Sequence, residues 1–590
     1  MVVLGVEKSL NHRTWVYRQS DEKSIEMLVQ KYNMPEILAR VLVARHVDFD
    51  LIDAFLNPTL KNQLPEPCQL KDMQKAVDRM AQSIINGEKI GIMGDYDVDG
   101  ATSSALLKLF LKSLHIKTRV FIPDRDDGYG PNAKEMQKFY DDGIRLVVTV
   151  DCGMTAFEPI DFGTKLGLDV IILDHHEPEK SLPNAYAVVN PKRLDESKDN
   201  PCHALAAVGV VFLTVVALNR TLREKGFYAD KKEPDLRQWL DLVAFGTVCD
   251  VVPLRGVNRL FVKSGIKQMA ARRNVGLTAL SDIAKITEKI GAYHLGYILG
   301  PRVNAGGRVG KSDLGMKLLS TFDEVEAIQL ASELEELNVL RRTIETEVLE
   351  DAVLQAQEAV EKGLPFILVK GAHWHQGVVG IVAGRLKEKY NLPSFVLSIE
   401  GNEAKGSSRS IPGIDLGALV IEALNKGILT RGGGHPMAAG FSLDKSKIKD
   451  FEDFLLSFIE PKMAHLEDTS SVLEVDGVLD IMAVQTDLLD KLNQLEPYGE
   501  GNPEPRFVIH DVKVAKTILT NNGHIICKLA GRNGGSLDAV SFRSKDTEMG
   551  QKLLSHAPGQ LFHFAGNLRL DTWNGKNKVQ LFIQDACLAG

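Results

Sequence analysis

Short apolar runs alternate with helix-like segments along residues 72–173, and this alternation limits the folds open to the chain. Strands that are connected by helices in this way pack as a parallel sheet with helices on both faces. The runs with the length of buried strands lie at Lys89–Met93, Thr118–Ile122, Arg145–Val150 and Asp169–Leu173. The helix-like segments lie at Ala101–Leu114, Asn132–Asp141 and Thr155–Leu166. We therefore predict an α/β domain with a doubly wound parallel sheet.

The full chain of 590 residues has room for roughly three to five domains of about 150 residues each. We predict that residues 1–75 form a mainly helical segment and that residues 76–275 form the doubly wound domain. Residues 276–363 are predicted to be a helical linker. Its last part, residues 323–362, contains no Pro or Gly, and we interpret this charged stretch as a solvated spacer helix.

Two further domains are predicted after the linker. Residues 364–465 contain strand-like runs at Pro365–Val369 and Ser394–Ser398 around a helix-like segment, which indicates a second α/β domain. In residues 466–590, apolar and polar residues alternate between turn signals such as Asn-Gly. This alternation predicts a small β-barrel of the OB type.

Several classes of protein are disfavoured. The six cysteines are scattered without a CxxC pair, which argues against a disulfide framework or a zinc ribbon and fits a reducing compartment. The N-terminus lacks the layout of a signal peptide. The longest apolar run, Leu205–Leu218, is shorter than the ~20 residues that span a bilayer. We therefore expect a cytoplasmic protein without a membrane segment.

The charge is distributed unevenly. The net charge is −8, but residues 501–590 contain 11 Lys and Arg against 7 Asp and Glu. A basic C-terminal module on an acidic body is a weak indication of a polyanionic partner. Chance fluctuation explains the same charge pattern equally well.

Acidic residues and histidines follow several of the predicted strands. In open α/β sheets, ligands bind beyond the carboxyl ends of the strands. The residues at these positions are Asp95, Asp97 and Asp99 in GDYDVDG, Asp151 in VVTVDCG, and Asp174, His175 and His176 in LDHHE. A later helical segment, FGTVCDVVPL, adds Asp250. These groups are therefore expected to meet at one edge of one sheet.

Carboxylates at such close range raise one another's pKa, and divalent cations remove the conflict. Hard oxygen ligands together with an imidazole suit Mn²⁺ or Mg²⁺. Two such ions about 3.5–4 Å apart can activate a water molecule and stabilise the leaving oxygen of a phosphoester. The sequence thus predicts a two-metal phosphoesterase site.

The motifs resemble those of a known family. GDYDVDGATSS, VVTVDCG, LDHHE and GTVCDVVPL resemble the four motifs of the DHH phosphoesterase superfamily. PRVNAGGRVG, HWHQGVVGIVAGR and GGGHPMAAG resemble, within it, the RecJ family of bacterial single-strand-specific exonucleases. This resemblance extends from about residue 40 to the end. It implies a DHH domain, a DHHA1-type domain and a C-terminal OB-fold.

The resemblance also implies roles for the acidic cluster. The positions that match the metal ligands of the family are Asp97, Asp99, Asp151, His175 and Asp250. Asp151 matches the carboxylate that bridges the two ions, and Asp95 is either a ligand or a neighbour of one. His176 matches the histidine that contacts the scissile phosphate, and Asp174 would orient the histidines.

Other residues are candidates for DNA contacts. The glycines of RGGGHPMAAG leave backbone N–H groups accessible to an anion, and hydroxyl and guanidinium groups suit phosphate oxygens. In the β-rich tail, Phe562 and Phe564 are expected to point inward, and Trp573 is expected to be an exposed stacking residue. The candidates for substrate binding are Arg125, Arg302, Ser407, Ser408, Arg409, Gly434, His435 and Trp573.

The resemblance implies an exonuclease that degrades single-stranded DNA from the 5′ end to mononucleotides, in recombination and repair. It also implies a monomer that works beside a single-strand-binding protein and a RecQ-type helicase. Two alternatives stay open. One is another DHH phosphoesterase, acting on short RNA, cyclic dinucleotides or pyrophosphate. The other is a replication scaffold without enzymatic activity.

Overall fold

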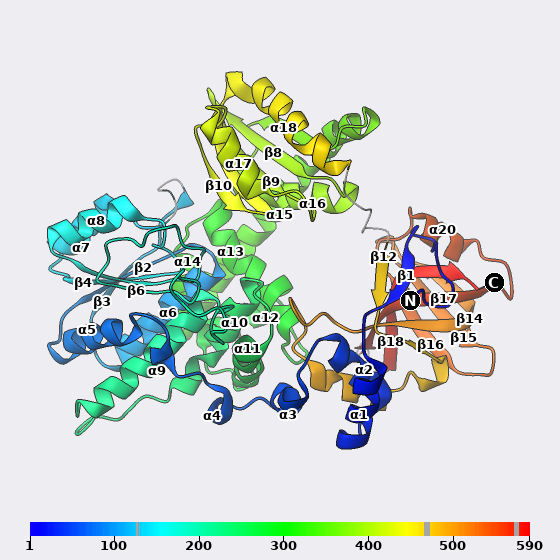
Figure 1. Ribbon diagram of the computed structural model, residues 1–590, viewed down its shortest axis with the longest axis horizontal. Helices are drawn as coiled ribbons and strands as arrows, with labels where there is room; N and C mark the ends of the chain where they lie inside the picture. The colour runs from blue at the N-terminus through cyan, green and yellow to red at the C-terminus, as the bar shows by residue number, and fades with distance from the viewer. Residues whose placement is uncertain (126–127, 129, 465–471, 572–577, 590) are drawn as a thin grey trace. The chain divides into compact units, whose positions relative to one another are not determined.

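The computed structural model describes residues 1–590 except 126–127, 129, 465–471, 572–577 and 590 (Figure 1). Two compact units are formed. The larger unit consists of Glu66–Asp250 and Ser264–Glu467, and the smaller one of Met1–Pro65, Val251–Lys263 and Asp468–Gly590. Among the described residues, no helix combines the length and the apolar character needed to cross a membrane.

The larger unit begins with a sheet of five parallel strands in the order β3-β2-β4-β5-β6. The strands are β2 (Ile90–Gly94), β3 (Thr118–Phe121), β4 (Leu146–Val150), β5 (Asp169–Leu173) and β6 (Ala187–Val189). The helices are α5 (Met73–Ile85), α6 (Val98–Ser113), α7 (Ala133–Asp141), α8 (Phe157–Leu166), α9 (Ala207–Glu224) and α10 (Leu240–Cys249). The predicted doubly wound sheet is confirmed. Strand β6 was not predicted, because three apolar residues at a sheet edge carry too little periodic signal.

The sequence order of the strands reverses between β2 and β4. From β2 the chain first adds β3 on one side and then returns to place β4 on the other. Both β2 and β4 are fully buried, which explains why they read as continuous apolar runs. The carboxyl ends of β2 and β4 therefore form the topological switch point at which open α/β sheets bind ligands.

Helices join this domain to the next one. They are α11 (Gly256–Met269), α12 (Val275–Ile283), α13 (Gly300–Val309), α14 (Leu314–Ser320), α15 (Glu324–Glu361) and the π-helix η5 (His294–Leu299). The 38 residues of α15 extend over about 57 Å. Its position matches the predicted spacer, but one face is buried at small residues that include Ala327, Ala331, Ala352 and Ala356. It is therefore a packed spine and differs from the solvated helix that we expected.

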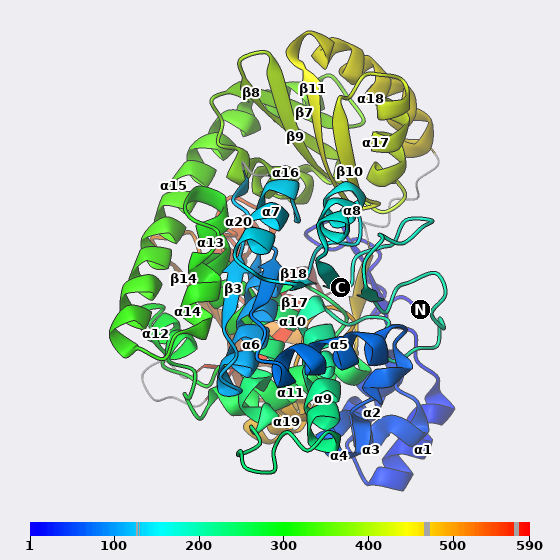
Figure 2. The same cartoon turned by 90° about the vertical axis from the view of Figure 1, so that its left-hand side faces the viewer.

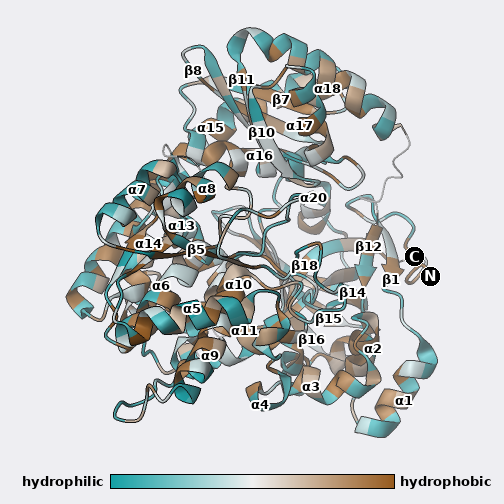
Figure 3. Cartoon of the chain, turned by 60° about the vertical axis from the view of Figure 1, so that its left-hand side comes forward, coloured by the Kyte–Doolittle hydropathy of each residue, from teal (hydrophilic) through white to brown (hydrophobic). Residues whose placement is uncertain are grey.

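The second domain of the larger unit has a mixed five-stranded sheet in the order β10-β11-β9-β8-β7. The strands are β7 (Ile367–Ala372), β8 (Ser394–Glu400), β9 (Glu403–Arg409), β10 (Arg431–His435) and β11 (Ala438–Asp444), and the helices are α16 (Gln376–Tyr390), α17 (Leu416–Asn425) and α18 (Ile448–Met463). Helices α15 and α16 share a core with β7 and β8, whereas α17 and α18 share another with the rest of the sheet (Figure 2). In Figure 3, α18 alternates between brown and teal segments, as expected of a helix with one buried face.

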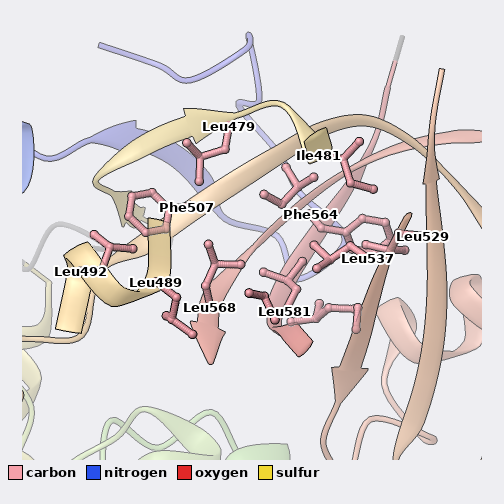
Figure 4. Packing of buried hydrophobic residues seen from close by; sticks show 14 of the residues in the cluster. Leu479, Ile481, Leu489, Leu492, Phe507, Leu529, Leu537, Phe564, Leu568 and Leu581 are labelled. Atoms are coloured by element: carbon pink, nitrogen blue, oxygen red, sulfur yellow. The ribbon is translucent and has the colours of Figure 1, made fainter. Parts of the chain in front are cut away.

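The smaller unit contains a closed barrel of five strands. The order β14-β15-β16-β18-β17 is closed by pairing of β17 with β14, and β13 extends it beside β14. The elements are β13 (Gly477–Leu479), α19 (Thr486–Leu492), β14 (Arg506–Leu519), β15 (Ile525–Gly531), β16 (Ser536–Ser541), α20 (Glu548–Leu554), β17 (Leu561–Asp571) and β18 (Lys578–Leu588). Leucines and phenylalanines fill the interior (Figure 4). Phe562 and Phe564 are fully buried, which confirms their predicted inward direction.

The N-terminal segment shares its core with this barrel. Its elements are β1 (Thr14–Tyr17), α1 (Glu22–Tyr32), α2 (Glu36–Ala44), α3 (Ile52–Leu56) and α4 (Leu60–Gln63), and β1 pairs in parallel with β12 (Val472–Val475). The buried side chains of Ser9 and Trp15 both donate hydrogen bonds to Asp585. The strand and the shared core were not expected from a segment that the sequence suggested to be helical and separate.

A buried ion pair holds α2 to this unit, and its loss should loosen the N-terminal segment. Arg45 donates to Asp476 at 2.9 Å, and the side chains are 3% and 0% exposed. Asp476→Ala leaves a buried cation without its partner, so we expect the opening free energy of β1 and β12 to fall by about 3–5 kcal/mol. Hydrogen exchange of peptides from these strands measures it. Glu22→Ala, which removes an exposed partner of Arg40, is the control and should cost about 0–1 kcal/mol. Equal effects of the two variants would contradict the argument.

Candidate active site

The switch point of the parallel sheet gathers the predicted acidic residues. Three groups of side chains have ligand atoms that all lie within 4.8 Å of one another. They are Asp95, Asp97 and Asp151; Asp151, His175 and His176; and Asp99, His175 and Asp250. All six predicted metal-ligating residues therefore converge, together with His176.

The turn after β2 presents Asp95 and Asp97. Asp97 is the N-cap of α6, and its carboxylate accepts a hydrogen bond from the Gly100 N–H at 3.0 Å. A Cβ at Gly100 would lie 2.4 Å from the carbonyl oxygen of Asp95, so only glycine allows this close approach. The tight turn buries Asp95, and burial together with the charge of Asp97 raises its pKa well above the usual value.

Asp99 has a different environment from its two neighbours. Its carboxylate accepts hydrogen bonds from the N–H groups of Ala207 and Val208, at 2.6 and 2.9 Å. These groups belong to the first turn of α9, where a negative charge is favourable. The Nε2 of His175 is 3.9 Å away. Asp99 therefore joins α6 to α9, whereas Asp95 faces the cluster.

Asp151 follows β4 in a left-handed conformation, with φ of 59°. This conformation is strained for a residue with a side chain, and such strain is concentrated at functional sites. Its Oδ1 lies 3.3 Å from Nε2 of His175. Burial and the carboxylates of Asp99, Asp97, Asp95 and Asp250 raise the pKa of Asp151 well above its ordinary value.

The two histidines after β5 differ in protonation. Burial and the neighbouring His176 lower the pKa of His175 to about 3, so His175 is neutral and can act as a metal ligand. Burial opposes the charge of His176, but its hydrogen bond to Asp174 at 2.7 Å raises the pKa of His176 to about 9. Asp174 also accepts from the N–H groups of Met154 and His175. It thus holds the DHH turn in place and orients His176, as predicted for it.

Asp250 closes the cluster from the end of α10. Its Oδ2 is 3.6 Å from Nδ1 of His175, and the next residue, Val251, has φ of 59°. Burial and the charges of Asp99 and Asp97 raise the pKa of Asp250 to about 9. The nearby thiols of Cys152 and Cys249 also have pKa values well above normal because of burial, which leaves them unsuited to act as nucleophiles.

The donor set fits divalent cations. Within the described part of the chain, Asp95 Oδ1, Asp250 Oδ2 and both ring nitrogens of His175 are buried without a hydrogen-bond partner. Buried polar atoms of this kind require a compensating interaction. Carboxylate oxygens with one imidazole are the ligands preferred by Mn²⁺ and also suit Mg²⁺. Several raised carboxyl pKa values in one place are the expected signature of a cation site described without its cations.

A group of arginines lies beside the acidic cluster. Burial and the guanidinium groups of Arg125, Arg341 and Arg409 lower the pKa of Arg308 to about 10. In the described residues, neither Arg308 nor Arg409 forms an ion pair with a carboxylate. Arg308 donates to the carbonyl of Gly377 at 2.9 Å, which ties α13 to the start of α16. Uncompensated arginines of this kind suit a phosphate group.

The arginine group directly adjoins the metal-binding turn. A Cβ at Gly307 would lie 3.0 Å from the carbonyl oxygen of Tyr96, which is the residue between Asp95 and Asp97. The guanidinium of Arg125 lies over the ring of Tyr96 at 4.4 Å, and its Nε donates to the carbonyl of Gly307. Arg308 was missed by the sequence analysis, although it is the last residue of PRVNAGGR.

The structure separates the other predicted DNA contacts. Arg302 forms an ion pair with Glu335 at 2.5 Å and donates to the carbonyl of Ile298, which is the environment of a structural arginine. On β9, Ser407 and Arg409 share one face and contact each other, whereas Ser408 is buried on the opposite face and donates to the carbonyl of Ala439. We therefore retain Ser407 and Arg409 as candidates and regard Ser408 as structural.

Gly434 and His435 lie on the exposed strand β10. A Cβ at Gly434 would be 2.5 Å from the backbone of Ala439, so close strand pairing requires glycine there. His435 pairs with Ala438 across a tight turn. Trp573 lies outside the described residues.

Comparison with known families identifies three domains. The model of the DHH family, N-terminal domain, matches residues 89–247, that of the DHHA1 domain matches 363–460, and that of the RecJ OB domain matches 475–585. The order of these matches follows the two sheets and the barrel described above.

Individual proteins are similar over most of the chain. The single-stranded-DNA-specific exonuclease RecJ of Bacillus subtilis (strain 168) is 33% identical over 98% of this chain and 71% of its own length. RecJ of Escherichia coli (strain K12) is 34% identical over 86% of this chain and 89% of its own length. The crystal structure of RecJ from Thermus thermophilus in complex with Mn²⁺ covers 97% of this chain and 79% of that chain, with a TM-score of 0.80 and 28% identity.

The different environments of Asp95 and Asp99 predict different effects of substitution. Asp95→Asn removes an oxygen that faces the cluster, so Mn²⁺ affinity should fall at least tenfold, while the metal-free protein keeps its stability because like-charge repulsion is relieved. Asp99→Asn weakens the cap of α9 and should cost about 1–2 kcal/mol of stability without metal. Calorimetric titration with Mn²⁺ and thermal unfolding in a chelator measure the two effects. The opposite assignment of effects to the two variants would show that Asp99 is the metal-facing residue.

Proposed function

We propose the function of this chain from the premise that it belongs to the RecJ family of single-stranded-DNA-specific exonucleases. The chain is a metal-dependent exonuclease that hydrolyses phosphodiester bonds of single-stranded DNA. We infer that it starts at the 5′ end and releases mononucleotides. The observation that carries this proposal is the contact between a buried acidic cluster and a group of uncompensated arginines.

The acidic cluster supplies the catalytic side of the site. Two Mn²⁺ or Mg²⁺ ions would be held by Asp95, Asp97, Asp151, His175 and Asp250, with Asp99 behind them. When bound, such ions activate water and stabilise the leaving oxygen of a phosphoester. His176 carries a positive charge at neutral pH because of Asp174, so its ring N–H donates to an oxygen of the scissile phosphate.

The arginine group supplies the polarity. A 5′-terminal phosphate is a dianion near neutral pH, whereas a 3′-terminal hydroxyl has no charge. Two buried arginines without a carboxylate partner, Arg308 and Arg409, are matched to the phosphate and not to the hydroxyl. Ser407 adds a hydroxyl beside Arg409. A strand anchored by its 5′ phosphate at this point presents its first internal phosphodiester to the adjoining acidic cluster.

The barrel supplies a second DNA-binding surface. Phe542 is 53% exposed, and its ring lies 5.1 Å from that of His524 and 5.3 Å from that of Phe582. The guanidinium of Arg569 lies 4.9 Å from the ring of Phe582. OB-folds bind single strands on such combinations of exposed aromatic and basic side chains. Phe542 therefore takes the stacking role that we expected for Trp573.

A single-strand-specific enzyme needs its substrate to be unwound. We propose, as the resemblance implies, that the monomeric chain works beside a RecQ-type helicase and a single-strand-binding protein in recombination and repair. The helicase would generate the single strand from duplex DNA, and the binding protein would keep it single-stranded.

The direction and the site can be tested together with one oligonucleotide labelled at either end. With Mn²⁺ we expect mononucleotides first from the 5′ label, and no release in a chelator or from Asp151→Ala. Arg409→Ala should raise KM about tenfold to a hundredfold for a 5′-phosphorylated strand, and much less for a strand with a 5′ hydroxyl. Arg385→Ala, an arginine that pairs with Glu345, is the matched control. First release from the 3′ label would overturn the polarity.

The barrel surface is tested separately by Phe542→Ala. We expect the Kd for a long single strand to rise about tenfold, because one stacking surface is lost, while kcat at saturation stays unchanged. Phe542→Tyr, which retains the ring, should bind like the parent. Fluorescence anisotropy measures Kd, and equal affinity of all three proteins would exclude this surface from binding.

A further inference from the structure

One continuous helical stretch, residues 292–309, connects the phosphate pocket with an exposed pair of tyrosines. It consists of the π-helix η5 followed without a break by α13. Arg308, in the phosphate pocket, is near its C-terminal end. Tyr297 lies eleven residues earlier, which corresponds to about 16 Å along the axis.

The middle of this stretch adjoins the acidic cluster. A Cβ at Gly300 would lie 2.6 Å from Sγ of Cys249, the residue before Asp250. The Cys249 thiol donates to the carbonyl of Leu295 at 3.4 Å, and a Cβ at Gly296 would contact Val248 at 3.4 Å. The absence of side chains at Gly296 and Gly300 thus brings η5 against the end of α10. Phosphate pocket, acidic cluster and tyrosines follow one another along a single helix.

The two tyrosines form a preordered aromatic surface. Their rings are stacked, with centroids 5.3 Å apart and an interplanar angle of 25°. Tyr297 is 75% exposed and Tyr293 is 53% exposed. Stacking of two large rings in water fixes their orientation before any ligand arrives, which lowers the entropic cost of binding a further flat group. π-Helical turns are rare and occur frequently at functional sites.

We propose that Tyr297, supported by Tyr293, is a stacking platform for the bases that follow the scissile phosphate. The inference rests on the proposed function, because it requires a strand that enters with its 5′ phosphate at Arg308. Such a strand passes the acidic cluster with its first internal phosphate and continues toward η5. Every base has a flat aromatic face, so a tyrosine platform holds the strand without selecting its sequence. Tyr297 is thus a positioning residue that keeps the next phosphodiester in register after each cleavage.

The test compares Tyr297→Ala with Tyr297→Phe on short 5′-phosphorylated strands. Tyr297→Ala should raise KM about tenfold and leave kcat within about twofold. Tyr297→Phe keeps the ring and should match the parent, as should Phe322→Ala, which removes another exposed aromatic side chain (65% exposed) from the same unit. The slope of log KM against log salt should be the same for Tyr297→Ala as for the parent, because no phosphate contact is lost. Unchanged KM in Tyr297→Ala overturns the inference.

A scan with abasic nucleotides separates stacking from a structural role. One abasic nucleotide, moved stepwise from the 5′ end, should raise the KM of the parent about tenfold at the positions that stack. At the same positions it should have no further effect on Tyr297→Ala. Additive effects overturn the inference even if Tyr297→Ala is impaired. If the parent releases 3′ ends first or has no nuclease activity, the proposed function fails together with the inference. A parent that behaves as proposed, with an unimpaired Tyr297→Ala variant, refutes the inference alone.

Discussion

The repulsion among the carboxylates around His175 is the constraint on which the rest of the larger unit depends. Asp95, Asp97, Asp151 and Asp250 are held within a few ångströms of one another although burial raises the pKa of three of them. Without cations, such an arrangement opposes folding, so the surrounding backbone must enforce it. Gly100 allows the tight turn after β2, Asp151 adopts a left-handed conformation, and the carboxylate of Asp99 joins α6 to the N-terminus of α9. These devices make the fold a rigid frame for two cations.

The arginine group is complementary to this cluster. Tyr96 lies between the two charged regions, with Asp95 and Asp97 on either side of it in the chain and Arg125 over its ring. Arg308 would be strongly destabilising if it were buried near other cations alone. A bound phosphate neutralises the arginines, and bound divalent ions neutralise the carboxylates. Substrate and metals therefore stabilise the same junction between the two domains of the larger unit, where Arg308 also holds Gly377.

The order of elements and the main site residues could be predicted from the sequence, because both depend on local patterns. Buried parallel strands are continuous apolar runs, and a carboxylate after such a run must lie at the sheet edge. The choice between Asp95 and Asp99 depends instead on α9, which begins more than a hundred residues later. Strand β1 pairs with β12 across more than four hundred residues, and no local pattern contains that information. The burial of α15 likewise follows from contacts with several other helices.

The two arginines of PRVNAGGR show how one fact about local structure changes a functional assignment. As letters, Arg302 and Arg308 are equivalent candidates for phosphate binding. Both lie in α13, and six residues on a helix of 3.6 residues per turn place them about 120° apart. They cannot both face the same pocket. Arg302 turns toward Glu335 of α15, so its charge is used in packing, and Arg308 is left without a carboxylate. The residue that lacks an ion pair in the folded protein is the one that suits an anionic ligand, and this distinction depends on helix phase rather than residue type.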